Sequence, residues 1–175
     1  MRMLHSSTPK TIQGPLLGRS RGTGSTYRKV GQPRSGGGTV GMILRSVAAV
    51  IAGLIVATAF AIGVEYMSSI LHPFPPGADP TDLAACRAHV ARYPAGVLLL
   101  ASLGWALGTL ASSWLAARLG PKRHAAHGIA VGLILLALAV VNMAMLPYPA
   151  WFWILNLILF PACFCFGARL GRGRR

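Results

Sequence analysis

Four apolar blocks, each about long enough to cross a bilayer, constrain this chain more than any other feature of its sequence. A helix needs about 20 apolar residues to span the hydrocarbon core. The blocks cover residues 43–70, 95–119, 125–146 and 150–170. Turns that contain proline or glycine, which interrupt helices, separate them. The sequence therefore predicts an all-α fold, an integral membrane bundle of four transmembrane helices within residues 42–171.

The composition excludes an ordinary soluble domain. Of the 175 residues, 54% are hydrophobic and 11% are charged, whereas soluble domains carry about 25% charged residues. The formal net charge of +14 would indicate a nucleic-acid partner in a soluble protein. Eight of the basic residues, however, lie within residues 1–45, mostly among Gly, Ser, Thr and Pro, and Tyr27 is the one Phe, Tyr or Trp among them. We therefore expect these basic residues to interact with the lipid bilayer and not with nucleic acid.

Residues 1–41 form a basic, Gly/Ser-rich segment, which we expect to be a disordered tail attracted to anionic lipid headgroups. The sequence Met42-Ile-Leu-Arg45, directly before the first block, predicts as an alternative that translation starts at Met42 and that residues 1–41 lie upstream of the true start. A secretory signal is excluded, because the first block is longer than the roughly 7–15 apolar residues of a signal peptide. Residues 172–175 form a second, short basic tail.

Basic residues near the turns set the orientation, because Lys and Arg mark the cytoplasmic side of a membrane protein. Fifteen of the 17 lie before or at the start of the first block, around the turn between the second and third, or at the end of the fourth. We therefore expect both termini in the cytoplasm and the loops 71–94 and 147–149 outside, in a multi-pass protein of a bacterial inner (plasma) membrane. Aromatic residues that favour a membrane interface agree with this orientation. They are Tyr66, Phe74, Tyr93, Tyr148, Trp151 and Trp153.

Small residues at four-residue spacing let transmembrane helices approach closely. The second block contains Gly104 and Gly108 at this spacing, and the third contains Gly128 and Gly132. We expect these faces to pack helices together within one chain. The alternative is a homodimer or a membrane-protein partner bound through the same four glycines.

Glu65 is the one acidic residue inside a predicted span, and an ionisable residue at membrane depth indicates a functional site by default. It lies five residues, or about 7 Å, from the outer end of its helix. Asn142 and Asn156 fall at nearly the same depth, and His72 extends the Glu65 face toward the external water. These side chains predict a polar pocket that binds a cation or a proton. The alternative is an interfacial carboxylate that hydrogen-bonds to the Asn amides and holds the bundle together.

The loop between the first and second spans predicts a short external helix over residues 80–92, with Asp79 as its N-cap. On this helix Asp82, Cys86 and His89 share one face, and their side chains are ligands of the zinc or copper class. The spacing matches no established metal signature. The alternative is therefore a solvated helix face, and we expect no cofactor.

Catalytic machinery is not recognisable in the sequence, which has no nucleophile–base pair, phosphate-binding loop or pair of carboxylates. We therefore expect no enzymatic activity. Two functions remain. The one we favour is a non-catalytic structural or partner-binding four-span subunit, and the alternative is a small proton-coupled transporter of cations or small molecules in which Glu65 titrates.

Residues 42–171 resemble small four-span bacterial inner-membrane proteins to which no activity is assigned. The resemblance rests on LRSVAAVIAG from Leu44, HPFPP from His72, GWALG from Gly104 with WLAARLG from Trp114, and LPYPAWFW from Leu146. It implies the four-span fold but no particular chemistry. The chain is similar in a weaker way to small multidrug-resistance exporters, which exchange protons for cationic drugs at a carboxylate in the first of four short spans. The sequence AIGVE, which ends at Glu65, carries this likeness, whereas the long external loop departs from it.

Overall fold

The structure is a computed structural model that describes residues 37–121 and 124–172. This part of the chain is all-helical, with five α-helices and no strand. The helices are α1 (Gly37–Leu71), α2 (Leu83–Val90), α3 (Ala95–Leu119), α4 (His124–Met145) and α5 (Ala150–Gly171). All but α2 are long and apolar enough to span a membrane. The predicted four-span bundle, with a short helix between spans 1 and 2, is therefore confirmed.

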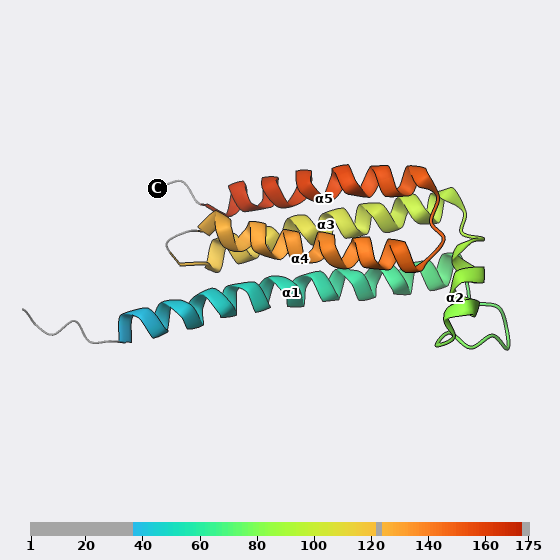
Figure 1. The fold of residues 1–175 in the computed structure, drawn as a ribbon, viewed down its shortest axis with the longest axis horizontal. Helices are drawn as coiled ribbons and strands as arrows, with labels where there is room; N and C mark the ends of the chain where they lie inside the picture. Colours follow the sequence, from blue (N-terminus) through green and yellow to red (C-terminus); the bar gives the residue numbers. More distant parts are fainter. Residues whose placement is uncertain (1–36, 122–123, 173–175) are drawn as a thin grey trace, which may run out of the picture. The chain divides into compact units, whose positions relative to one another are not determined.

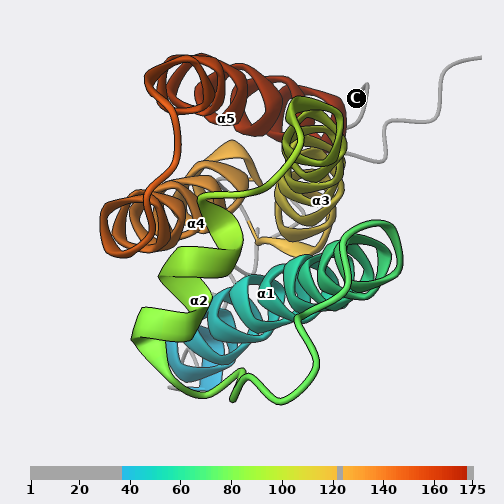
Figure 2. The same cartoon turned by 90° about the vertical axis from the view of Figure 1, so that its right-hand side faces the viewer.

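The four long helices lie side by side, and α2 lies at one end of them (Figure 1). We call this the α2 end; the turn between α3 and α4 and the end of α5 are at the opposite end. Viewed from the α2 end, α3 lies between α1 and α5, and α4 lies on the other side of the bundle (Figure 2). α3 contacts every other long helix, whereas α1 and α4 share the smallest of the helix interfaces. α3 is therefore the central element.

α1 begins at Gly37, six residues before the predicted span and inside the segment predicted to be a tail. Residues 37–41 continue the helix with no proline between them and the apolar block. They do so although three of the five are Gly, which disfavours a helix by about 1 kcal/mol each. The predicted tail boundary at residue 41 is therefore wrong. The predicted disorder of residues 1–36 lies outside the described part of the chain, and the ends of α4 and α5 differ from the prediction by one residue each.

Asp82, not Asp79, is the N-cap of α2, so the helix begins three residues later than predicted. The Asp82 carboxylate accepts hydrogen bonds from the backbone N–H groups of Ala84 (3.1 Å) and Ala85 (3.3 Å). Asp79 instead accepts from the backbone N–H (2.8 Å) and hydroxyl (2.7 Å) of Thr81. Asp is a favoured N-cap residue, so the sequence alone allows either position. Asp82 is the N-cap because its carboxylate reaches the free amides at the start of the helix.

Two glycines of α3 let it approach α1. A methyl group added to Gly104 would collide with the side chain of Val64, and one added to Gly108 would lie 2.8 Å from Cβ of Phe60. Both positions thus require the smallest residue. These glycines pack helices within the chain, which is the first of the two predicted alternatives.

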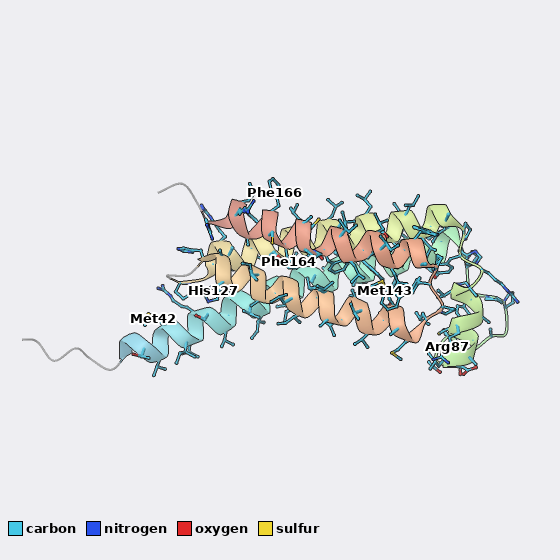
Figure 3. The ribbon with its side chains drawn as sticks, turned by 45° about the horizontal axis from the view of Figure 1, so that its top comes forward. Met42, Arg87, His127, Met143, Phe164 and Phe166 are labelled. Atoms are coloured by element: carbon cyan, nitrogen blue, oxygen red, sulfur yellow. The ribbon has the colours of Figure 1, made fainter. Side chains whose placement is uncertain are left out.

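Two glycines of α4 let it approach α3 and α5. A methyl group on Gly128 would lie 2.5 Å from the carbonyl oxygen of Ser113, and one on Gly132 would collide with Phe164. Phe164 is buried among the helices, whereas Phe166 points away from them (Figure 3). A partner bound through the four predicted glycines stays a prediction, since their faces already pack against helices of the same chain.

Gly167 and Gly171 form a third pair of glycines, which joins α5 to α3. A methyl group on Gly167 would lie 2.5 Å from the carbonyl oxygen of Leu110, and one on Gly171 would lie 2.6 Å from that of Trp114. The two glycines have the same four-residue spacing as the predicted pairs, so the sequence contained the signal.

Gly128→Ala is expected to destabilise the bundle by about 1–3 kcal/mol, because the added methyl group overlaps a backbone oxygen of α3. Gly63→Ala is the matched control, since a methyl group there meets no atom within 4 Å. Its stability should stay the same or rise slightly, because Ala favours a helix more than Gly does. Unfolding in mixed micelles of increasing SDS content measures both variants. Equal effects of the two substitutions would contradict this packing.

Candidate functional site

Two adjoining cavities lie between α1, α3 and α4. The deep cavity, of about 340 Å³, extends along α1 from Leu54 to Glu65. The outer cavity, of about 320 Å³, continues from Glu65 past His72 to α2. Three residues line both cavities, namely Glu65, Trp105 and Asn142. They therefore mark the junction between the two.

The predicted pair of Glu65 and Asn142 comes together at this junction, from α1 and α4. The Glu65 carboxylate forms no hydrogen bond or ion pair with another residue of the described ranges. A charged side chain at the centre of a membrane helix costs about 2.5–3.5 kcal/mol, and a cavity that reaches the end of the bundle lowers this cost. In the loops at that end, burial raises the pKa of Tyr93 and Tyr148, and the negative charge of Glu65 raises both further.

Asn156, predicted to share the Glu65 pocket, lies elsewhere. It is fully buried, and its side-chain N–H groups donate to the hydroxyl of Ser102 (3.0 Å) and to the carbonyl oxygen of Phe152 (2.8 Å). Its Oδ1 atom has no hydrogen-bond partner in the described part of the chain. Asn156 therefore joins α5 to α3 and does not line either cavity.

His72 lines the outer cavity, as its predicted position on the Glu65 face requires. Its ring stacks on that of His89, with the ring centroids 4.7 Å apart. Tyr93 meets both imidazoles edge-on at 5.1 Å, and Phe74 lies 4.4 Å from His89. We call these four rings the ring cluster. Sequence reasoning missed the stack, because a proline-rich loop separates the two histidines and no spacing rule crosses such a loop.

The predicted metal face of α2 makes other contacts. Asp82 caps the helix, the Cys86 thiol donates to the carbonyl oxygen of Pro80 (3.2 Å), and His89 belongs to the ring cluster. Within residues 37–121 and 124–172, no three His, Cys, Asp or Glu side chains are placed to hold one metal ion. The alternative prediction, a solvated helix face, does not hold for His89, because its side chain is only 7% exposed.

Arg87 fastens α2 to α4. Its Nε–H donates to the carbonyl oxygen of Met145 at 2.8 Å, and Figure 3 shows Arg87 at the α2 end of the bundle. Met145 is the last residue of α4, where helix carbonyls lack partners within the helix. α2 thus bridges the ends of α1 and α4. The sequence did not predict this contact, because it showed Arg87 only as an isolated basic residue between two spans.

Comparisons with protein families, with curated proteins and with solved structures found no match for this chain. The resemblance to four-span inner-membrane proteins and to small multidrug-resistance exporters therefore stays a prediction. The site has to be interpreted from its own geometry, which combines one carboxylate, one amide and several aromatic rings.

The attachment of α2 to α1 should weaken as the pH falls. Burial lowers the pKa of His89, and the neighbouring His72 and Arg92 lower it further, although a hydrogen bond to the His72 backbone offsets part of the effect. In a detached α2, His89 has its ordinary pKa of about 6.5. Because the detached form binds the proton more readily, attachment is complete above about pH 6.5 and is lost as the pH falls toward the lowered pKa.

Hydrogen exchange of the α2 amides, corrected for the intrinsic effect of pH on exchange, measures this attachment. Exchange should accelerate in the wild type as the pH falls below about 6.5. His89→Phe keeps a ring but cannot titrate, so its exchange should not respond. An equal response of both proteins would show that His89 is not the group responsible.

Proposed function

We propose that this chain is a non-enzymatic, multi-pass protein of a bacterial inner membrane, with both termini in the cytoplasm, and that it serves as a binding subunit. Its ligand or partner presents a cationic group, which Glu65 receives from the external side. The observation that carries the proposal is the position of Glu65, which lies at the junction of two cavities and is unpaired among the described residues.

The lining of the cavities favours a cation over an anion. Glu65 is the one acidic residue in the described lining of both cavities, and that lining contains no Lys or Arg. Asn142 offers an amide oxygen at the same level. The ring of Trp105 also lines the junction, and an aromatic face attracts a cation by about 0.5–2 kcal/mol. All three groups therefore act in the same direction.

The hydrogen bonds of two side chains in the outer cavity, Ser69 and Cys86, support a non-enzymatic role. The Ser69 hydroxyl donates to the carbonyl oxygen of Tyr66 (2.8 Å), and the Cys86 thiol donates to that of Pro80 (3.2 Å). An activated nucleophile instead donates to a general base. Neither group is arranged for nucleophilic catalysis.

The distribution of charge supports the proposed orientation. The acidic residues of the chain lie on the last turns of α1 or in the segment just before α2; they are Glu65, Asp79 and Asp82. Basic residues mark the opposite end of the bundle, at Arg118, Arg169 and Arg172. Since basic residues favour the cytoplasmic side, the α2 end is assigned to the exterior.

Fluorescence quenching of Trp105 tests the proposal. Trp114, Trp151 and Trp153 are replaced by Phe, so that Trp105 is the remaining tryptophan of the four. In nanodiscs, Glu65→Gln should reduce quenching by the cation N-methylpyridinium by about tenfold, the equivalent of about 1.4 kcal/mol. The neutral quencher acrylamide should affect both proteins equally.

Asp79→Asn is the matched control, because it removes the same charge from an exposed position near the α2 end. It should leave quenching by N-methylpyridinium unchanged. Equal quenching of wild type and Glu65→Gln by the cation would contradict the proposal.

Proton-coupled transport, with Glu65 as the titrating group, is the second candidate. The deep cavity favours it, since this cavity continues from Glu65 over 11 residues of α1, or roughly 16 Å, toward the opposite end. A transporter in proteoliposomes releases protons when a cation is added, and Glu65→Gln abolishes the release. A binding subunit binds the cation but moves neither cation nor proton across the membrane.

A further inference from the structure

α2 is held in a different way from the other helices. The long helices contact one another through their backbones, with glycines at the points of closest approach. Among the described residues, α2 makes no backbone-level contact with any other helix. Side chains alone therefore attach it to the bundle.

Two attachments stand out, and they join α2 to different helices. The Arg87 guanidinium donates to the carbonyl oxygen of Met145, at the end of α4. The His89 ring stacks on His72, the residue that follows α1. Each attachment is made by one α2 side chain, so the loss of one leaves α2 held on one side only.

The segments on both sides of α2 are loops. Residues 72–82 precede it and residues 91–94 follow it. The first loop contains Gly77 at a φ of +80°, with no atom near the position that a side chain would take. Loops of this kind absorb the backbone changes of hinge motions, and elements with few buried contacts open at low cost in free energy.

The outer cavity lies directly beneath this weakly held helix. Cys86, His89 and Val90 of α2 line it together with Glu65 and Asn142. Viewed from the α2 end, α2 lies in front of α1 and beside α4 (Figure 2). Glu65 is exposed along α1, and it is the route to it through the outer cavity that passes these α2 side chains.

We propose that α2 is a lid over the outer cavity, hinged on its flanking loops and latched by Arg87 to α4 and by His89 to His72. Opening of the lid admits the cationic group to Glu65. As a device that regulates this site, the lid rests on the proposed function, but its movement needs no ligand and can be measured alone.

A spin-label distance between α2 and α4 tests the lid. Labels are placed on Ala88→Cys and Ala144→Cys, two exposed positions, in full-length protein in nanodiscs. The native cysteines are replaced by Ser; they are Cys86, Cys163 and Cys165. Pulsed electron paramagnetic resonance should show one main, short distance in this background.

Removal of a latch should open the lid. Arg87→Gln is expected to raise the population at longer distance about tenfold. Arg92→Gln removes the same charge from an exposed position just after α2 and should keep the closed distance. Unchanged distances in Arg87→Gln, or equal opening in both variants, would overturn the proposal.

Substitutions at His72 test the second latch without relying on a change of charge state. His72→Ala should open the lid, and His72→Phe, which keeps a ring for the stack, should hold it closed. Labels on exposed Leu99 and Ile154 check that α3 and α5 stay together in each variant. Opening in His72→Phe equal to that in His72→Ala would contradict the ring latch.

The lid and the proposed function can fail separately. All distances are measured with no cation present, so a static α2 removes the lid whatever Glu65 binds. Quenching of Trp105 that does not respond to Glu65→Gln removes the cation site even if α2 moves.

Discussion

Backbone contact on one short segment of α3 is the interaction on which the rest of the structure depends. Methyl groups added to Gly53, Gly128, Gly167 or Gly171 would all meet backbone atoms of α3 between residues 110 and 118. These glycines come from α1, α4 and α5. In a bilayer, apolar surface gains little by leaving lipid for protein, so helices associate through such close packing. The segment therefore holds three helices at once.

The cavities follow from where this contact ends. The deep cavity begins at Gly108 and Thr109 of α3, directly after the closely packed segment. Beyond that point toward the α2 end, Gly104 still packs closely against Val64 of α1. The large side chain of Trp105, however, lines the cavity, and the α1–α4 interface is the smallest in the bundle. One end of the bundle is thus closed by backbone contact, while the other contains a space with Glu65 in its wall.

The sequence predicted what depends on composition and on depth, but not what depends on helix rotation or on contacts across loops. The spans follow from local apolarity, and depth correctly placed Glu65 and Asn142 at one level. Depth could not distinguish Asn142, which lines the cavities, from Asn156, which is buried against Ser102. That difference depends on which face each helix turns inward. The stack of His72 on His89 joins residues whose relation only the folded loop creates.

The two ends of the bundle are held by different kinds of contact, side-chain contacts at the α2 end and backbone packing at the other. This difference favours binding over transport. In the proposed lid mechanism, access to Glu65 through the outer cavity requires the release of α2, which side chains hold. Access from the opposite end requires Gly53 of α1 to leave α3, where an added methyl group would lie only 3.0 Å from the carbonyl oxygen of Ser112. Separation there would break backbone-level packing that has no replacement in lipid. With the proposed lid at one end and close backbone packing at the other, the arrangement fits the proposed binding role better than transport.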